Sequence, residues 1–144
     1  MTTYNHLKIQ NLSIFLLLSI LFSGCINQAP IKSFTTPVLI INKSRNNISM
    51  LSSVHSSLYV DKNGCIRLGN DSGPLIIWHH DSKLENSFDG KITIIEGFTG
   101  KSIFIGDQIT LSGGLHDLEP TNVTPIIPKT CSNHGYWISG PLKK

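Results

Sequence analysis

Charged residues are scarce in this sequence, and no part of it concentrates them. Only 15% of the residues are charged, and the net charge of the whole chain is +3. A protein that binds nucleic acid carries its basic residues on one clustered face. Here they are dispersed, so we expect no nucleic-acid partner. Hydrophobic residues make up 40% of the chain, which is typical of a folded domain rather than a disordered one.

Signatures of common enzyme classes are also absent. The sequence has no Gly-x-Ser-x-Gly elbow, which presents the nucleophile of many hydrolases. The segment Gly97–Ser102 resembles the end of a phosphate-binding loop, but two residues separate its glycines where such a loop has four, and strand-forming residues follow in place of a helix. We interpret this segment as a β-turn. We therefore expect a protein that is not an enzyme and needs no cofactor.

No apolar run reaches the ~20 residues that a membrane-spanning helix needs. The longest run, from Leu12 to Phe22, is interrupted only by serines, and Lys8 is the only charged residue before it. A basic residue followed by a short apolar run predicts a secretory signal. Two small residues, Ser23 and Gly24, then precede Cys25.

The sequence Leu21-Phe22-Ser23-Gly24-Cys25 resembles the lipobox of bacterial lipoproteins. In that family a diacylglyceryl group is attached to the cysteine thiol, the signal is removed just before this residue, and its new amino group is usually acylated, as with palmitate. The resemblance implies a helical signal peptide over residues 1–24 and lipidation of Cys25. Phe22 departs from the pattern, because leucine is usual there. The alternatives are an ordinary cleaved signal and an uncleaved anchor.

The same resemblance implies a place in the cell. Two or three acyl chains hold a lipoprotein stably on a membrane of the bacterial cell envelope. Residue 26 is isoleucine rather than aspartate, which resembles lipoproteins sent on to the outer membrane of diderm bacteria. We therefore expect a lipid-anchored protein at the outer membrane, facing the periplasm. Residues 25–37 are mostly polar and contain two prolines, so we expect them to form an extended, lipidated tether.

Acylation of Cys25 would leave two cysteines in an exported domain. We expect Cys65 and Cys131 to form a disulfide, because disulfides persist in oxidising compartments. The competing interpretations, a pair of metal thiolates or a redox pair, would be favoured by a Cys-x-x-Cys spacing, which the sequence lacks.

Residues 38–144 have the pattern of one β-rich globular domain. The clearest element is a hairpin, in which Leu58–Val60 and Cys65–Leu68 are joined by the turn Asp61–Gly64. We expect irregular structure at 42–57 and a long loop at 115–135. Further strands are expected at 75–78, 91–96, 101–105, 108–112 and 136–139, and the short apolar run at 38–41 is a weaker candidate for a first strand.

Six or seven short strands without a convincing helix predict an all-β fold, either a small closed barrel or a sandwich. We expect Trp78, in a wholly apolar run, to lie in the core. Tyr136 and Trp137 should point to opposite faces of their strand, with one of them exposed.

A second resemblance bears on the fold. Several segments together look like a pattern in uncharacterised secreted and lipoprotein domains of bacteria, namely Asn63–Leu68, Leu75–Trp78, Gly106–Gly114, and Cys131 with Tyr136 and Trp137. The segment Gly106–Gly114 also resembles a strand of OB-type barrels. The resemblance favours an OB-like barrel and implies no chemistry.

His79 and His80, followed by Asp81, are the candidate ligands for a metal ion. Imidazole suits zinc and copper, and His116 or His134 from the long loop would complete such a site. Adjacent residues on a strand point to opposite faces, so the pair would share one ion only if the strand ends before them. The alternative interpretation is a polar strand end with solvent-exposed imidazoles.

Two functions are therefore expected. The first is an envelope lipoprotein that acts as a binding or structural accessory module, with membrane lipid and an envelope protein as its partners. The alternative is a metal- or small-ligand-binding envelope protein that uses His79 and His80.

Overall fold

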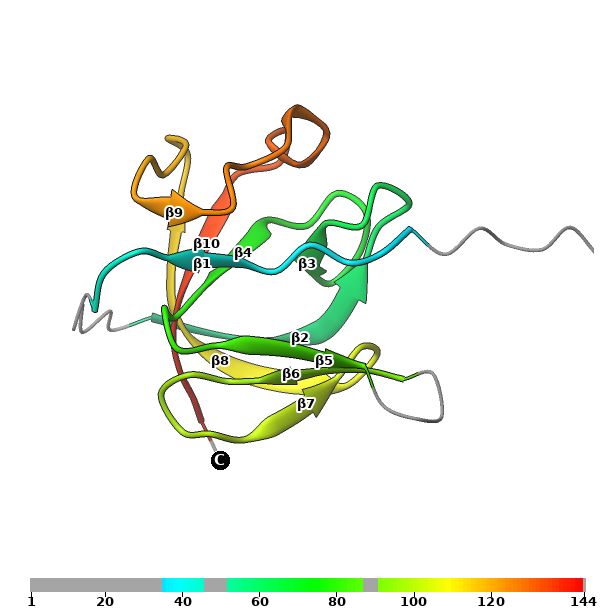
Figure 1. The fold of residues 1–144 in the computed structure, drawn as a ribbon, viewed down its shortest axis with the longest axis vertical. Coiled ribbons are helices and arrows are strands. Elements are labelled where there is room, and N and C mark those ends of the chain that lie inside the picture. The colour runs from blue at the N-terminus through cyan, green and yellow to red at the C-terminus, as the bar shows by residue number, and fades with distance from the viewer. Residues whose placement is uncertain (1–34, 46–51, 87–90, 144) are drawn as a thin grey trace, which may run out of the picture. The chain divides into compact units, whose positions relative to one another are not determined.

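The computed structural model describes residues 35–45, 52–86 and 91–143. The predicted signal peptide, the lipidation site Cys25 and most of the predicted tether lie outside these residues. Within them the chain forms ten strands and one short 3₁₀ helix (Figure 1): β1 (Ile40–Asn42), β2 (Ser52–Val60), β3 (Ile66–Leu68), β4 (Leu75–Trp78), β5 (Lys83–Asn86), β6 (Ile92–Ile95), β7 (Ser102–Phe104), β8 (Gln108–His116), β9 (Val123–Thr124), the 3₁₀ helix η1 (Lys129–Cys131) and β10 (Tyr136–Leu142). No helix among the described residues is both long and apolar enough to cross a membrane.

Five of the strands close into a barrel in the order β2-β3-β4-β10-β8, with β8 pairing back onto β2. All neighbours are antiparallel except β4 and β10, which are parallel. The third barrel strand thus pairs with the fifth, and the fourth returns to the first, which is the connectivity of an OB-type barrel. The predicted all-β barrel is confirmed, and its closure excludes the sandwich.

The hairpin predicted around Asp61–Gly64 is confirmed. Its two strands pair antiparallel, with Leu58 opposite Leu68 and Val60 opposite Ile66. The Asp61 carboxylate accepts hydrogen bonds from the backbone N–H groups of Asn63 and Cys65, each 2.9 Å long. These bonds close the turn, because an aspartate can satisfy the backbone of the residues that follow it.

Three strands are longer than the sequence predicts. β10, expected to end at residue 139, continues to Leu142. Ser52–Ser57, expected to be irregular, extends β2 and pairs with β8. β8 continues to His116, although Gly113 was expected to end it. A Cβ on Gly113 would lie 2.2 Å from the carbonyl oxygen of Ile138, so this glycine lets β10 approach closely instead of ending the strand.

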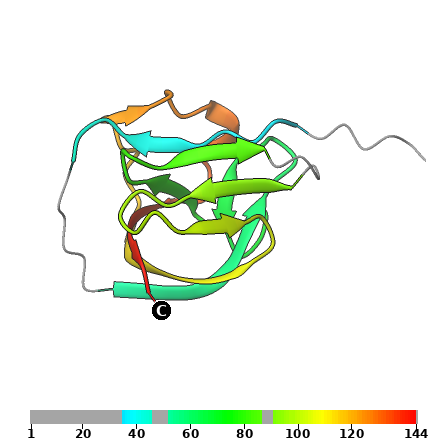
Figure 2. The same ribbon diagram turned by 60° about the horizontal axis from the view of Figure 1, so that its bottom comes forward.

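β5, β6 and β7 form a separate three-stranded antiparallel sheet within the connection from β4 to β8. Figure 1 places this sheet at the opposite end of the domain from β9, and Figure 2 turns the sheet toward the viewer. Ile94 and Ile103 from this sheet join the apolar interior of the barrel. The strands β6 and β7 were predicted, whereas β5 was missed, and the segment Gly97–Gly100 forms the expected turn between β6 and β7.

The barrel has an inner and an outer apolar cluster, because residues along a strand alternate between its two faces. On β4, Ile76 and Trp78 belong to the inner cluster, and Leu75 and Ile77 belong to the outer one. Trp78 is fully buried, as predicted. Trp137 points inward and Tyr136 outward, but both are buried, so the expectation that one of them is exposed was wrong.

The segment from Asp117 to Gly135 lies over the outer face of β3 and β4. It contains β9, which pairs with β1, and η1, which brings Cys131 to Cys65. The predicted disulfide is confirmed, with its Cα atoms 5.6 Å apart. The first described residues also contact the barrel. Pro37 is buried, and Thr35 donates a hydrogen bond of 2.9 Å to the Lys62 carbonyl.

Candidate functional site

The outer face of β3 and β4, with the loops beside it, is the surface on which OB-type barrels commonly bind oligonucleotides and oligosaccharides. In this chain the outer apolar cluster covers that face. Its buried members come from β1, β4, β9, the loop before β10 and β10 itself, and the disulfide holds the covering segment in place. The face is therefore filled by the protein's own side chains.

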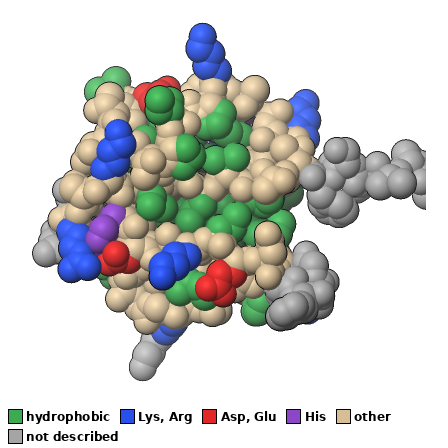
Figure 3. All heavy atoms as spheres, viewed as in Figure 1, with side chains coloured by type: hydrophobic (Ala, Val, Ile, Leu, Met, Phe, Trp, Pro, Cys, Tyr) green, Lys and Arg blue, Asp and Glu red, His purple; other side chains and the backbone are tan. Residues whose placement is uncertain are grey.

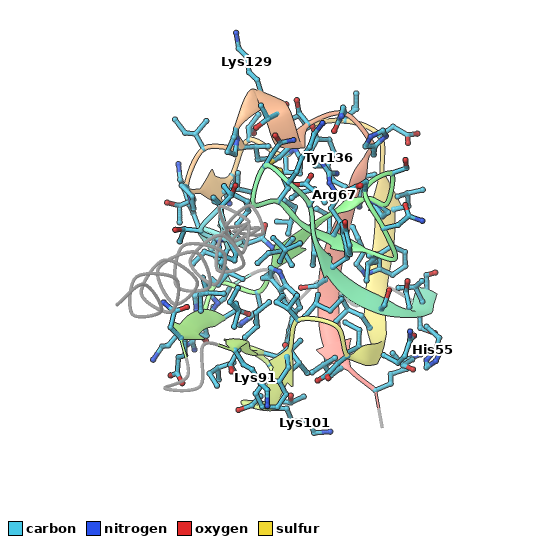
Figure 4. The ribbon with its side chains drawn as sticks, turned by 90° about the vertical axis from the view of Figure 1, so that its right-hand side faces the viewer. His55, Arg67, Lys91, Lys101, Lys129 and Tyr136 are labelled. Atoms are coloured by element: carbon cyan, nitrogen blue, oxygen red, sulfur yellow. A yellow bond between two sulfur atoms is a disulfide. The ribbon has the colours of Figure 1, made fainter. Side chains whose placement is uncertain are left out.

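Arg67 lies beneath this cover and binds it to the barrel. Its guanidinium donates to the Asp61 carboxylate at 2.7 Å, to the Gly73 carbonyl at 3.1 Å and to the Cys131 carbonyl at 3.2 Å. Figure 4 shows Arg67 and Tyr136 in the same half of the domain, below the segment that carries Lys129. Because the Arg67 guanidinium is hydrogen-bonded within the domain, we assign Arg67 a structural role.

The histidine pair lies immediately after β4. The strand ends at Trp78, and the Ser82 N–H donates to the His79 carbonyl at 2.9 Å, which turns the chain. Because the strand has ended, the two side chains are not held on opposite faces. His79 Nε2 and His80 Nδ1 lie 3.3 Å apart, and their rings meet nearly perpendicular, with an interplanar angle of 77°.

The His79 ring is held in place by the turn between β6 and β7. The Phe98 ring packs against it with centroids 3.9 Å apart, and a Cβ on Gly97 would lie 2.7 Å from His79 Nδ1. The Gly97 N–H in turn donates to the Ser82 hydroxyl at 3.0 Å. Burial lowers the pKa of His79 from its ordinary 6.5, because the charged imidazolium loses hydration, and neighbouring His80 lowers it further.

Asp81 and Arg45 complete the site on its exposed side. The Asp81 carboxylate lies 2.9 Å from His80 Nε2 and 3.9 Å from His79 Nδ1. Arg45, three residues after β1, places its Nε 2.9 Å from the same His80 Nε2 and its guanidinium 3.4 Å from Asp81. Figure 3 shows a histidine at the surface with basic and acidic side chains beside it.

The other histidines named from the sequence lie elsewhere. Within the described residues, the group that could hold a metal ion consists of His79, His80 and Asp81. His116 lies at the end of β8 beside a surface hollow of about 330 Å³, and His134 borders a second hollow of about 240 Å³. The expected contribution of either to the histidine pair is therefore wrong. Arg45, which does reach the pair, carried no signal in the sequence.

Glu119, which lines the hollow beside His116, already has a hydrogen-bond partner. The Tyr136 hydroxyl lies 3.2 Å from Glu119 Oε2 and 3.3 Å from the Ser132 carbonyl oxygen. Burial raises the pKa of Tyr136, and the nearby Glu119 carboxylate raises it further.

Comparisons with known proteins give no family for this chain. No protein-family model, curated protein or solved structure matches it. The class of the protein, an all-β chain with a closed five-stranded barrel and one disulfide, therefore follows from its own residues and topology.

Proposed function

We propose that this chain is a lipid-anchored protein of a bacterial cell envelope whose barrel serves as a binding or structural accessory module. The single observation that carries the proposal is the Cys65–Cys131 disulfide, because such bonds persist in exported proteins and are rare in the cytosol of mesophiles. It agrees with the export signal and the acylated Cys25 that the N-terminal sequence predicts.

The filled outer face supports an accessory role. A barrel that covers its usual ligand surface with its own apolar cluster leaves that surface unavailable to a ligand. A partner protein in the envelope would then bind the remaining surface of the domain. Ile26 favours the outer membrane as the site of anchoring.

The anchor is tested by expressing the full chain in a diderm bacterium with an alkyne analogue of palmitate. We expect label on the native chain and an intact mass that begins at Cys25 with a diacylglyceryl group. Cys25→Ala should abolish the label, whereas Ser23→Ala, which keeps a small residue, should retain it. A native chain recovered without lipid would contradict the proposal.

The membrane is tested by separating inner and outer membranes from the same cells. The native chain should fractionate with the outer membrane, and Ile26→Asp should shift it to the inner membrane while palmitate labelling stays unchanged. Equal distribution of the two variants would contradict an outer-membrane address but leave the lipid anchor intact.

A further inference from the structure

The two nitrogens that face each other across the histidine pair have the spacing of two ligands on one metal ion. His79 Nε2 and His80 Nδ1 are 3.3 Å apart. Two nitrogens bound at about 2.0–2.1 Å lie roughly 3.3–3.4 Å apart on a tetrahedral ion and roughly 2.8–3.0 Å apart on neighbouring corners of a square-planar one, the arrangement that copper(II) prefers. The backbone turn after β4 therefore already brings the two nitrogens to within about 0.5 Å of the distance that chelation of copper(II) requires.

Asp81 lies on the outer side of both rings. Its two carboxylate oxygens are directed to the nitrogens that do not face the partner ring, at 2.9 Å from His80 Nε2 and 3.9 Å from His79 Nδ1. At 2.9 Å the carboxylate holds a proton on His80 Nε2 and leaves His80 Nδ1 with its lone pair, as a carboxylate does beside metal-bound histidines. The distance of 3.9 Å to His79 Nδ1 is too long for a hydrogen bond, and the Asp81 N–H lies 3.4 Å from that nitrogen. Asp81 thus favours the metal-binding tautomer of His80.

Arg45 favours the opposite arrangement of protons. Its Nε can only donate, so the contact of 2.9 Å to His80 Nε2 requires a lone pair on that outer nitrogen. A neutral His80 then carries its proton on Nδ1 and donates it to His79 Nε2, which closes the gap between the rings. Because the Arg45 side chain is 73% exposed, it can move into solvent when an ion displaces this proton.

The surroundings keep one ligand fixed and the other accessible. His79 is wedged between Phe98 and the backbone at Gly97, which prevents its ring from turning away. The His80 side chain is 19% exposed, so an ion can enter from solvent and retain water on its remaining positions. A site with few protein ligands and open positions is accessible to exchange, unlike a closed structural zinc site.

We propose that His79 Nε2 and His80 Nδ1 chelate one divalent transition-metal ion, with Asp81 as the carboxylate that sets the tautomer of His80 and Arg45 as the competing donor. Two imidazole ligands and solvent select copper(II) ahead of zinc(II), and exclude magnesium, which prefers oxygen. This site does not depend on the lipid anchor, so its failure and that of the anchor are separate results.

The test uses the full chain, purified in detergent, treated with a chelator and dialysed. Isothermal titration with Cu²⁺ should give one ion per chain, Zn²⁺ should bind more weakly, and Mg²⁺ should give no heat. The Cu²⁺ electron paramagnetic resonance spectrum should show splitting from two nitrogens. A featureless titration, or a spectrum with oxygen ligands alone, overturns the proposal.

Variants assign the ligands. His80→Ala should abolish one-to-one binding, while His55→Ala, which removes an exposed histidine of β2 that contacts Thr110, should leave it unchanged. Asp81→Asn should weaken Cu²⁺ binding about tenfold, as loss of an outer carboxylate does elsewhere. Arg45→Gln should lower the Kd several-fold, because it removes both a positive charge and the competing donor.

The Arg45 variant keeps the test decisive even if a histidine variant folds poorly, which its thermal unfolding curve would reveal. A tighter complex in Arg45→Gln shows that the bound ion lies beside Arg45, since removal of an arginine far from the ion would not change the affinity. Unchanged Cu²⁺ affinity in His80→Ala, or an equal loss in His55→Ala, overturns the assignment of the site.

Discussion

Arg67 and Asp61 form an ion pair of 2.7 Å in which the two side chains are only 1% and 5% exposed. The pair joins three parts of the domain. Asp61 closes the hairpin turn through the N–H groups of Asn63 and Cys65, and Arg67 reaches the carbonyl of Cys131 in the covering segment. The ion pair therefore couples the barrel to its cover at the same place as the disulfide.

Replacement of Arg67 by leucine should destabilise the protein strongly. It would leave the buried Asp61 carboxylate without its cation, and breaking a buried pair from one side costs about 3–5 kcal/mol. Urea unfolding followed by tryptophan fluorescence measures this change, since Trp137 and Trp78 are both buried. Lys62→Ala, on the exposed turn next to Asp61, should change the free energy of unfolding by less than about 0.5 kcal/mol. Similar values for the two variants would show that the pair contributes little.

Low pH should weaken the ion pair between Asp61 and Arg67. Burial alone would raise the pKa of Asp61, but the hydrogen bonds from Arg67 and from the N–H groups of Cys65 and Asn63 outweigh it and hold the pKa below its ordinary 3.8. The folded state then binds fewer protons than the unfolded state near this pH, so stability rises with pH. The contribution is complete above 3.8 and is lost as the pH falls through the folded pKa.

This pH dependence is measured by urea unfolding at a series of pH values in the native protein and in Asp61→Asn. The native protein should lose stability more steeply below pH 3.8 than the variant does, because the variant has no carboxylate at this position to protonate. Parallel curves for the two proteins would show that Asp61 has the same pKa folded and unfolded.

Elements that depend on local chemistry could be predicted from the sequence. The hairpin around Asp61–Gly64 follows from a turn whose side chain satisfies its own backbone, and Trp78 follows from an uninterrupted apolar run. The predicted strand at 108–112 stopped short of the observed β8 because glycines commonly end strands. In the structure, the missing Cβ of Gly113 instead lets β10 approach closely. β5 was missed because its residues are mostly exposed, so only its pairing with β6 reveals it.

The site was predicted only in part for a related reason. His79 and His80 could be named as candidate ligands from the sequence, because two histidines side by side offer two imidazoles for a metal ion. Their meeting depends on where β4 ends, and their neighbours Arg45 and Phe98 arrive from segments distant in sequence. Such contacts are set by tertiary packing, which no short pattern encodes.

Removal of the disulfide should lower the free energy of unfolding only moderately, because other contacts also hold the covering segment. The bond spans 66 residues, and closing a loop of that length stabilises the folded state by about 4 kcal/mol in the chain-entropy model. We expect Cys65→Ala with Cys131→Ala to lower the free energy of unfolding by that amount or less, since Arg67 still binds the Cys131 carbonyl. Adding Arg67→Leu should then produce a loss that differs from the sum of the separate losses, because neighbouring contacts couple. If the two losses in free energy of unfolding simply add, the disulfide and Arg67 hold the covering segment independently of each other.

Gly97 and Gly100 lie in one turn but should respond to alanine for different reasons. A Cβ on Gly97 would meet His79 Nδ1 at 2.7 Å and the Ser82 nitrogen at the same distance, and such overpacking costs roughly 1–3 kcal/mol. Gly100 has open space around its Cβ position but a φ of +68°, so alanine there costs about 1–2 kcal/mol through backbone strain alone. Thermal unfolding should therefore show losses of similar size in both variants. The NMR resonances of the His79 imidazole separate them: they should move in Gly97→Ala, where the ring must shift, and stay in place in Gly100→Ala. Movement in both variants would mean that the turn positions His79 as a unit rather than through the contact at Gly97.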